Sequence, residues 1–344
     1  MPERGGKAKP LSGQPKAEPM SNLVTIYGGS GFVGRYIAQR MARAGWRVRV
    51  AVRRPNEAMF VKPYGTVGQV EPMLCNIRDD NSVRVAASGS DAVINCVGTF
   101  DAGGKNNFDA VQHEGAERIA RIAKEEGVAR MVHISAIGAD KNGVSDYART
   151  KGLGEAAVLA SFPDAMILRP SVIFGTEDDF FNRFAGMARM GPVLPLVGAK
   201  TKFQPVYVDD VAQAAVKGAL GGASGIYELG GPDVDDFRGL MGTMLEVVRR
   251  RCLILALPNW VGSIIARVTG FMSFITGGIA PQPVTVDQVK QLATDSIVGP
   301  DALGFDDLGI QPTAMQAILP SYLWQFRPDG QYSDITKSAG NLRG

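Results

Sequence analysis

The stretch LVTIYGGSGFVG, residues 23–34, constrains the fold of this chain more than any other. Its apolar half reads as a buried strand, and Gly28, Gly31 and Gly34 follow within seven residues, before a new apolar segment begins. In this position the first glycine permits a sharp turn, the second lets main-chain N–H groups approach a phosphate, and the third lets a helix pack on the strand. The stretch therefore predicts a phosphate-binding turn between a strand and a helix.

The spacing Gly28-x-x-Gly31-x-x-Gly34 departs from the GxGxxG fingerprint of dinucleotide sites, so the prediction depends on the strand before it and the helix after it. The helix N-terminus adds partial positive charge. We include the other residues of the turn, Ser30, Phe32 and Val33, in the predicted cofactor site.

Strands and helices then alternate along the chain. Strands are expected at 23–27, 47–52, 67–74, 91–97, 130–135, 165–170 and 226–231, and helices at 33–45, 81–87, 108–127, 147–161, 180–190 and 207–220. This rhythm predicts an α/β fold, a doubly wound parallel sheet of Rossmann type with helices on both faces. The chain should not add sheet beyond Asp233.

The predicted organisation has three parts. Residues 1–20 form a disordered basic tail, and residues 21–230 form the nucleotide-binding domain, with part of a smaller domain inserted around 175–205. Residues 231–344 form a smaller, mostly helical C-terminal region that caps the site or docks on a partner. Met20 is an alternative start.

The end of the second strand indicates which dinucleotide is bound. An NAD site places Asp or Glu there for the ribose 2′-hydroxyl, whereas this strand ends VRVAVRRP, with Arg53 and Arg54. The planar fork of arginine suits a 2′-phosphate. NADPH is therefore favoured over NAD, with solvated surface arginines as the alternative.

Three further residues form a reactive set. Ser135 ends the fifth strand, and Tyr147 and Lys151 follow as YARTK, four residues apart on one helix face. A lysine ammonium beside a phenol lowers the pKa of that phenol and makes it a usable acid or base, while a serine hydroxyl can hold a carbonyl. We expect these three to be catalytic if the protein turns over a substrate.

Composition excludes several classes. With 37 basic and 34 acidic side chains, the formal net charge of +3 does not favour nucleic acid as a partner. The three cysteines form no CxxC pair, so neither a disulfide framework nor a metal site is predicted. The first twenty residues lack the apolar core of a secretory signal.

One C-terminal segment, CLILALPNWVGSIIARVTGFMSFITGG at 252–278, is strongly apolar. Pro258 and Arg267 interrupt it, so it does not read as a transmembrane helix. Two interpretations remain open: a buried cap helix, or an exposed apolar face that docks on a partner or a membrane surface.

Several of these motifs together resemble an extended or atypical short-chain dehydrogenase/reductase over residues 22–230. They are GGSGFVG, NCVG at 95–98, the Ser135/Tyr147/Lys151 set and LRPSVIFG at 168–175. The resemblance implies that Lys151 also binds the nicotinamide ribose and that LRPSVIFG runs beside the nicotinamide. It adds to the expected cofactor site Asn76, Ile77, Val97, Gly98, Pro170 and Val172.

A longer stretch, from HISAIG at 133 through FGTEDDFFNRFA at 174–185, is similar to the SDR-like accessory subunit of respiratory complex I, NADH:ubiquinone oxidoreductase. That resemblance implies tightly held, structural NADPH, other complex I subunits as partners, and a place in the peripheral arm beside the membrane. A bacterial form would lie on the cytoplasmic face of the inner (plasma) membrane, reaching the membrane surface through the complex.

The sequence does not decide whether the protein catalyses a reaction. Active relatives often carry an asparagine in the helix before the fifth strand, where this chain has His113 as a relay candidate or as a loop residue. His133 reads as a packed core histidine. Two alternatives to an accessory subunit remain: an independent NADP-dependent reductase or sugar-nucleotide epimerase, and an NADP-sensing regulator without chemistry.

Overall fold

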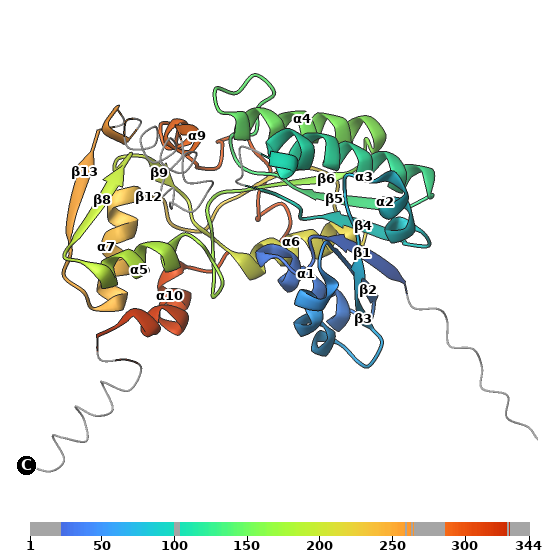
Figure 1. Cartoon of the computed structure of the whole chain (residues 1–344), viewed down its shortest axis with the longest axis horizontal. Coiled ribbons are helices and arrows are strands. Elements are labelled where there is room, and N and C mark those ends of the chain that lie inside the picture. Colours follow the sequence, from blue (N-terminus) through green and yellow to red (C-terminus); the bar gives the residue numbers. More distant parts are fainter. Residues whose placement is uncertain are drawn as a thin grey trace, which may run out of the picture.

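The computed structural model describes residues 22–99, 104–258, 260–262, 264, 286–328 and 330. The chain forms a larger lobe around an open sheet and a smaller lobe beside it (Figure 1). The predicted tail at 1–20 and most of the apolar segment at 252–278 lie outside the described residues.

The larger lobe contains a seven-stranded sheet whose strands all pair in parallel, in the order β11-β6-β5-β4-β1-β2-β3. The strand order reverses at β1, whose neighbours are β2 and β4, and ligands of doubly wound proteins bind at such a switch point. The predicted fold is confirmed, and Pro72 lies in the edge strand, where a missing N–H is tolerated. The strands are β1 (Leu23–Tyr27), β2 (Arg47–Val52), β3 (Val70–Leu74), β4 (Ala92–Asn95), β5 (Arg130–Ile134), β6 (Met166–Pro170) and β11 (Gly225–Leu229).

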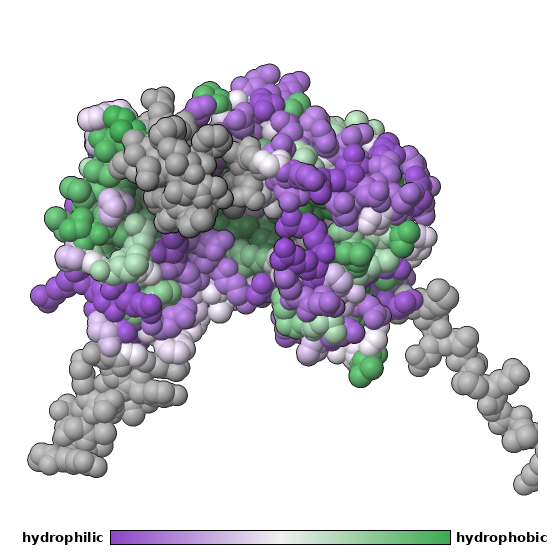
Figure 2. All heavy atoms as spheres, viewed as in Figure 1, coloured by the Kyte–Doolittle hydropathy of each residue, from purple (hydrophilic) through white to green (hydrophobic). Residues whose placement is uncertain are grey.

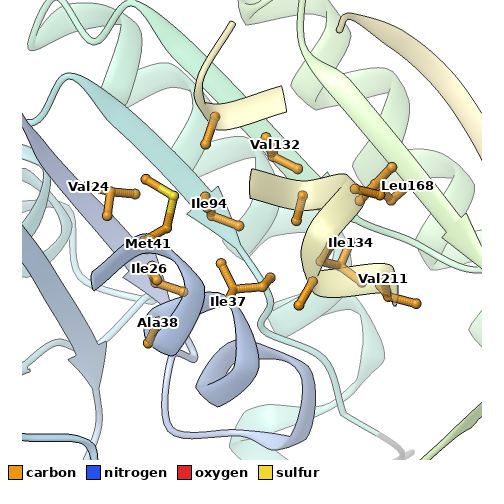
Figure 3. Packing of buried hydrophobic residues seen from close by; sticks show 14 of the residues in the cluster. Val24, Ile26, Ile37, Ala38, Met41, Ile94, Val132, Ile134, Leu168 and Val211 are labelled. Carbon is orange, nitrogen blue, oxygen red and sulfur yellow. The ribbon is translucent and has the colours of Figure 1, made fainter. Parts of the chain in front are cut away.

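Helices cover both faces of this sheet. Figure 3 shows the face under α1 (Phe32–Arg43) and α6 (Val208–Ala219), where alternate strand residues pack on Ile37, Met41 and Val211. The opposite face packs on α2 (Asp80–Ala87), α3 (Glu114–Glu125) and α4 (Asp146–Ser161). Because side chains alternate along a strand, each residue at a strand end points to a known face. A π-helical turn, Asp109–His113, precedes α3, and short 3₁₀ turns lie at Pro55–Tyr64, Gly104–Asn106 and Trp324–Phe326.

The smaller lobe packs three helices against short strands. Its core is rich in aromatic rings: Phe180 stacks on Phe237 with centroids 5.5 Å apart, and Phe184 and Phe203 meet the same ring edge-on. The helices are α5 (Phe181–Met190), α7 (Phe237–Val248) and α10 (Met315–Leu323), and the strand pairs are β7 (Ile173–Phe174) with β10 (Val206–Tyr207), β8 (Val193–Val197) with β13 (Leu253–Leu257), and β9 (Lys202–Phe203) with β12 (Asp235–Asp236).

Strand β13 contradicts the prediction that no sheet follows Asp233, because LILAL pairs in parallel with β8. A short apolar run does not reveal by periodicity whether it is strand or helix. Its exposed leucines, Leu253 and Leu255, contribute to the apolar surface over this lobe, whereas hydrophilic residues cover α3 and α4 (Figure 2). Among the described residues, no helix is long and apolar enough to cross a membrane.

After α9 (Val286–Gln291) the chain returns to the larger lobe. Leu303 forms a bridge with Tyr227 on the edge strand β11, and Phe305, Leu308 and Ile310 join the core beside α6. The residues that complete the larger lobe therefore come from both ends of the described chain.

Candidate nucleotide-binding site

The glycine turn leaves β1 at the switch point of the sheet. Gly28 has φ +74°, which favours glycine, and its N–H donates to Ala51 O at 2.9 Å. A Cβ on Gly34 would lie 2.4 Å from the carbonyl oxygen of Gly28, so the first turn of α1 can only approach the strand this closely through a glycine. Gly31 is the N-cap of α1 and provides no side-chain cap, so the turn presents main-chain N–H groups to a ligand.

The loop after β4 lies against this turn. A Cβ on Gly28 would lie 3.3 Å from both the main chain of Cys96 and the Val97 side chain. Gly98 follows, and a Cβ placed there would lie 4.0 Å from Lys151 Nζ. The structure thus brings Val97 and Gly98 between the glycine turn and the reactive set, although these segments lie far apart in the sequence.

Arg53 and Arg54 follow β2, which pairs with β1 up to Tyr27 and Ala51. Both are exposed, and Arg54 forms a surface ion pair with Glu57 at 3.1 Å. Such a pair contributes little energy and leaves the guanidinium available to a phosphate.

Arg35 is a further cation beside the glycine turn, in addition to Arg53 and Arg54, and the sequence reasoning missed it. It donates to Ser30 O at 3.2 Å, lies over the Phe60 ring at 4.9 Å and pairs with Glu177 at 3.3 Å. In the sequence, the one feature that points to a role for Arg35 at the turn is its position directly after Gly34.

Asn76 and Ile77 follow β3. Asn76 is exposed and its amide oxygen accepts from Arg78 N, whereas Ile77 is buried against Gly115 at the start of α3. The side chain of Asn76, rather than that of Ile77, is therefore the one open to a ligand.

The reactive set comes together at the end of β5. Ser135 is buried at 4% exposure, and Lys151, on α4, donates to Ile134 O at 3.0 Å. Burial lowers the pKa of Lys151 to about 8, while the nearby Glu155 opposes that shift. The ammonium is therefore held at the carboxyl end of the sheet, close to Gly98.

The expected lowering of the Tyr147 pKa is wrong for this structure. The phenol packs edge-on against Phe108, with ring centroids 6.1 Å apart, and burial raises its pKa to about 12. Desolvation causes this shift, and the Lys151 ammonium binds the main chain of Ile134.

The amino end of α4 is held by a residue from the C-terminal region. Asp287, on α9, accepts from Asp146 N at 2.7 Å and from Tyr147 N at 3.3 Å. Ser145 caps the same helix by accepting from Ala148 N at 3.1 Å. No sequence pattern links Asp287 to Tyr147, so only the structure reveals this contact.

The LRPSVIFG stretch leads from the sheet to the smaller lobe. Pro170 ends β6 and accepts from Ile137 N at 3.0 Å, and Val172 accepts from Val206 N at 2.9 Å. Just beyond it, the buried Asp178 of the FGTEDDFFNRFA motif accepts from Tyr322 OH at 2.5 Å and from Gly175 N at 3.1 Å. That motif therefore fastens α10 to the smaller lobe.

The two histidines of the chain differ in burial and in their contacts. His133 is 1% exposed, hydrogen-bonds Asn95 and has a pKa lowered by burial to about 3, which confirms the predicted core position. His113 is half-exposed, with Nδ1 3.8 Å from Asp109. No cluster of metal-ligating side chains occurs within the part of the chain that the structure describes.

A glycine turn at the switch point, arginines after β2 and a buried lysine beside β4 and β5 define a dinucleotide-binding protein of Rossmann type. The model of the NAD(P)H-binding family matches residues 28–219. The chain belongs to this NAD(P)H-binding family.

Among known proteins, the chain is 34% identical over 316 residues to the mitochondrial NADH dehydrogenase (ubiquinone) 1 alpha subcomplex subunit 9 of Arabidopsis thaliana, covering 90% of this chain and 79% of that one. It is 31% identical over 207 residues to a ceramide reductase of Caulobacter vibrioides, covering 60% and 64% of the two chains. A UDP-glucose 4-epimerase structure from Thermus thermophilus, in complex with NAD, shares the fold with a TM-score of 0.64 at 18% identity, covering 89% of this chain and 99% of that one.

Proposed function

We propose that this protein is a nucleotide-holding accessory subunit of respiratory complex I, NADH:ubiquinone oxidoreductase. The observation that carries the proposal is the similarity to subunit 9 of the mitochondrial enzyme, which extends through both lobes of this chain. The other subunits of complex I are its partners, and it contributes to their assembly and stability near the membrane interface.

The nucleotide we propose is NADPH, bound across the carboxyl edge of the sheet. The glycine turn would hold the pyrophosphate, Arg53 and Arg54 the 2′-phosphate, and Lys151 with Tyr147 the nicotinamide ribose. Val97, Gly98, Pro170 and Val172 would line the nicotinamide half, and the side chain of Asn76 with the main chain of Ile77 the adenine half. The exposed arginines after β2 support NADPH over NAD.

The location we propose is the peripheral arm of a bacterial complex I, on the cytoplasmic face of the inner membrane. The relative above is mitochondrial, so this placement is a separate proposal with its own test. The chain would reach the membrane surface through the complex, with residues 231–344 as the capping and docking region.

A second candidate is an independent NADP-dependent reductase. The similarity to the Caulobacter ceramide reductase favours it, as does the retained Ser135, Tyr147 and Lys151 set. Holding the nucleotide and reducing a carbonyl require the same tyrosine and lysine, so these residues alone do not separate the candidates.

The test starts from the native membrane fraction, which is gently solubilised and resolved for complex I. We expect this chain to migrate with the complex and to release NADPH on denaturation, and we expect that NADPH to stay reduced while the complex oxidises NADH. Inside-out vesicles treated with protease would report which face of the membrane carries the chain.

The contrary result is a chain that elutes alone and exchanges its nucleotide freely. The reductase candidate would then predict consumption of NADPH with a carbonyl substrate, abolished by Tyr147→Phe. A Tyr147→Phe protein that retains full turnover would exclude that candidate as well.

A further inference from the structure

Two polar atoms buried at the end of β5 have no hydrogen-bond partner among the protein atoms that the structure describes: His133 Nε2 and Ser135 Oγ. His133 is 1% exposed and Ser135 is 4% exposed. A buried polar group without a partner is costly and rare, so two of them side by side point to a ligand site.

Both atoms lie on the same face of the sheet. His133 and Ser135 are two residues apart, so their side chains point the same way, toward α3 and α4. Neither atom hydrogen-bonds the other or any further protein atom that the structure describes. One water molecule that accepts from the first and donates to the second would satisfy both.

The hydrogen bonds of Asn95 determine where His133 carries its proton. Asn95 Oδ1 accepts from Val97 N at 3.0 Å, so its amide nitrogen is the atom that faces His133 Nδ1, at 3.1 Å. An amide nitrogen can only donate, which makes His133 Nδ1 an acceptor. The imidazole is neutral, because burial holds its pKa near 3, and its one proton is therefore on Nε2.

These bonds all run in one direction. Val97 N–H donates to Asn95, Asn95 donates to His133, and the Nε2–H of His133 has no acceptor among the protein atoms that the structure describes. Lys151 cannot accept this proton, because an ammonium only donates hydrogen bonds. It already donates one of its three protons to Ile134 O. The Nε2–H of His133 therefore needs an oxygen atom that accepts from it.

We propose that Asn95 and His133 are positioning residues that bind an internal water molecule between His133 Nε2 and Ser135 Oγ, and that this water turns the Ser135 hydroxyl proton outward. The water accepts from His133 and donates to Ser135. Ser135 then donates to an oxygen of the bound nucleotide or substrate, which is the part of the inference that rests on the proposed nucleotide site.

The first test reads the tautomer directly in the protein without nucleotide. The chain has two histidines, so ¹⁵N-histidine NMR spectra of the full-length protein are assigned with a His113→Asn variant. We expect His133 to be neutral from pH 6 to pH 8 with its proton on Nε2. A proton on Nδ1, or a charged ring at pH 6, overturns the proposal.

A near-isosteric change tests the direction of the chain. In Asn95→Asp the carboxylate still accepts from Val97 N but can no longer donate to Nδ1, so the His133 proton should move to Nδ1. We expect NADPH affinity to fall by roughly 3- to 10-fold in that variant, the value of one hydrogen bond. An unchanged tautomer in the folded variant overturns the proposal.

The role of Ser135 is tested in a double-mutant cycle with His133→Gln and His133→Leu. Glutamine keeps a donor and should retain NADPH affinity within about 2-fold, whereas leucine should lose roughly 3- to 10-fold. Ser135→Ala should add nothing to His133→Leu, and full additivity would refute the coupling. If the wild-type protein binds no NADPH, the proposed function fails while the tautomer result still judges this inference.

Discussion

Lys151 Nζ lies 3.0 Å from the carbonyl oxygen of Ile134, so the protein itself fixes the ammonium of α4 to the end of β5. The lysine is 5% exposed and lies beside the loop that follows β4. An ammonium held in this position is already placed to bind a ligand, but burying its charge lowers the stability of the folded protein.

This position predicts a pH dependence of stability. Burial lowers the pKa of Lys151 from the usual 10.5 to about 8, so between those values the unfolded chain holds a proton that the folded chain has released. Stability therefore rises with pH across that window, relative to a variant without the lysine. We expect the free energy of unfolding of wild type minus Lys151→Met to increase on the order of 2 kcal/mol from pH 7.5 to pH 10.

Urea unfolding at several pH values measures this difference, with Lys200→Met on the surface as the control. Lys151→Met should also lose NADPH binding, whereas Lys200→Met should keep it. Parallel stability curves for wild type and Lys151→Met would show that the lysine keeps its charge in the folded state.

Gly34→Ala tests the close approach of α1 to β1. The added methyl would lie 2.4 Å from Gly28 O and 2.7 Å from Gly29 Cα, both main-chain atoms that cannot move aside cheaply. We expect a loss of about 1–3 kcal/mol in the free energy of unfolding and a loss of nucleotide binding. Gly242→Ala, inside α7 with nothing within 4 Å, is the matched control and should stabilise by about 0.5–1 kcal/mol. Equal stability of the two variants would contradict this account of the turn.

Asp287→Ala tests the contact between the C-terminal region and the reactive helix. Without the carboxylate, two N–H groups at the start of α4 lose their acceptor, and α9 loses a connection to the site. We expect NADPH to dissociate several-fold faster, with a stability loss of about 1 kcal/mol. Stopped-flow displacement measures the rate, with exposed Asp301→Ala as the control. Identical rates would mean that α9 does not restrain the nucleotide.

Arg53→Ala with Arg54→Ala tests the choice of dinucleotide. Charge-assisted hydrogen bonds to the 2′-phosphate should be lost, so NADPH affinity should fall by roughly 10- to 100-fold while NADH affinity changes little. Fluorescence titration measures both, and Arg47→Ala, at the opposite end of β2, is the control. An equal loss for both nucleotides would assign the arginines to the surface instead.

The sequence predicted the parallel sheet well, because buried strands and amphipathic helices alternate clearly up to β11. It also placed His133 in the core. It missed β13, since LILAL has no periodicity that distinguishes a strand from a helix. It missed Asp287, since a contact between positions so distant in sequence leaves no local pattern.

The error over Tyr147 has an electrostatic cause. Spacing on a helix correctly places Tyr147 and Lys151 on one face, but it does not report how much water surrounds them. The structure shows the phenol against Phe108, where desolvation dominates. Which groups are dry is a property of the packed fold and not of the motif.

The return of the chain through Phe305, Leu308 and Ile310 has a consequence for biogenesis. These residues complete the core of the lobe whose first strand begins at Leu23. A ribosome synthesises them only after the whole of α7 and β13, so the nucleotide-binding lobe stays incomplete until they are made. The smaller lobe is completed by α10, so the two lobes receive their last core residues from neighbouring segments of the chain.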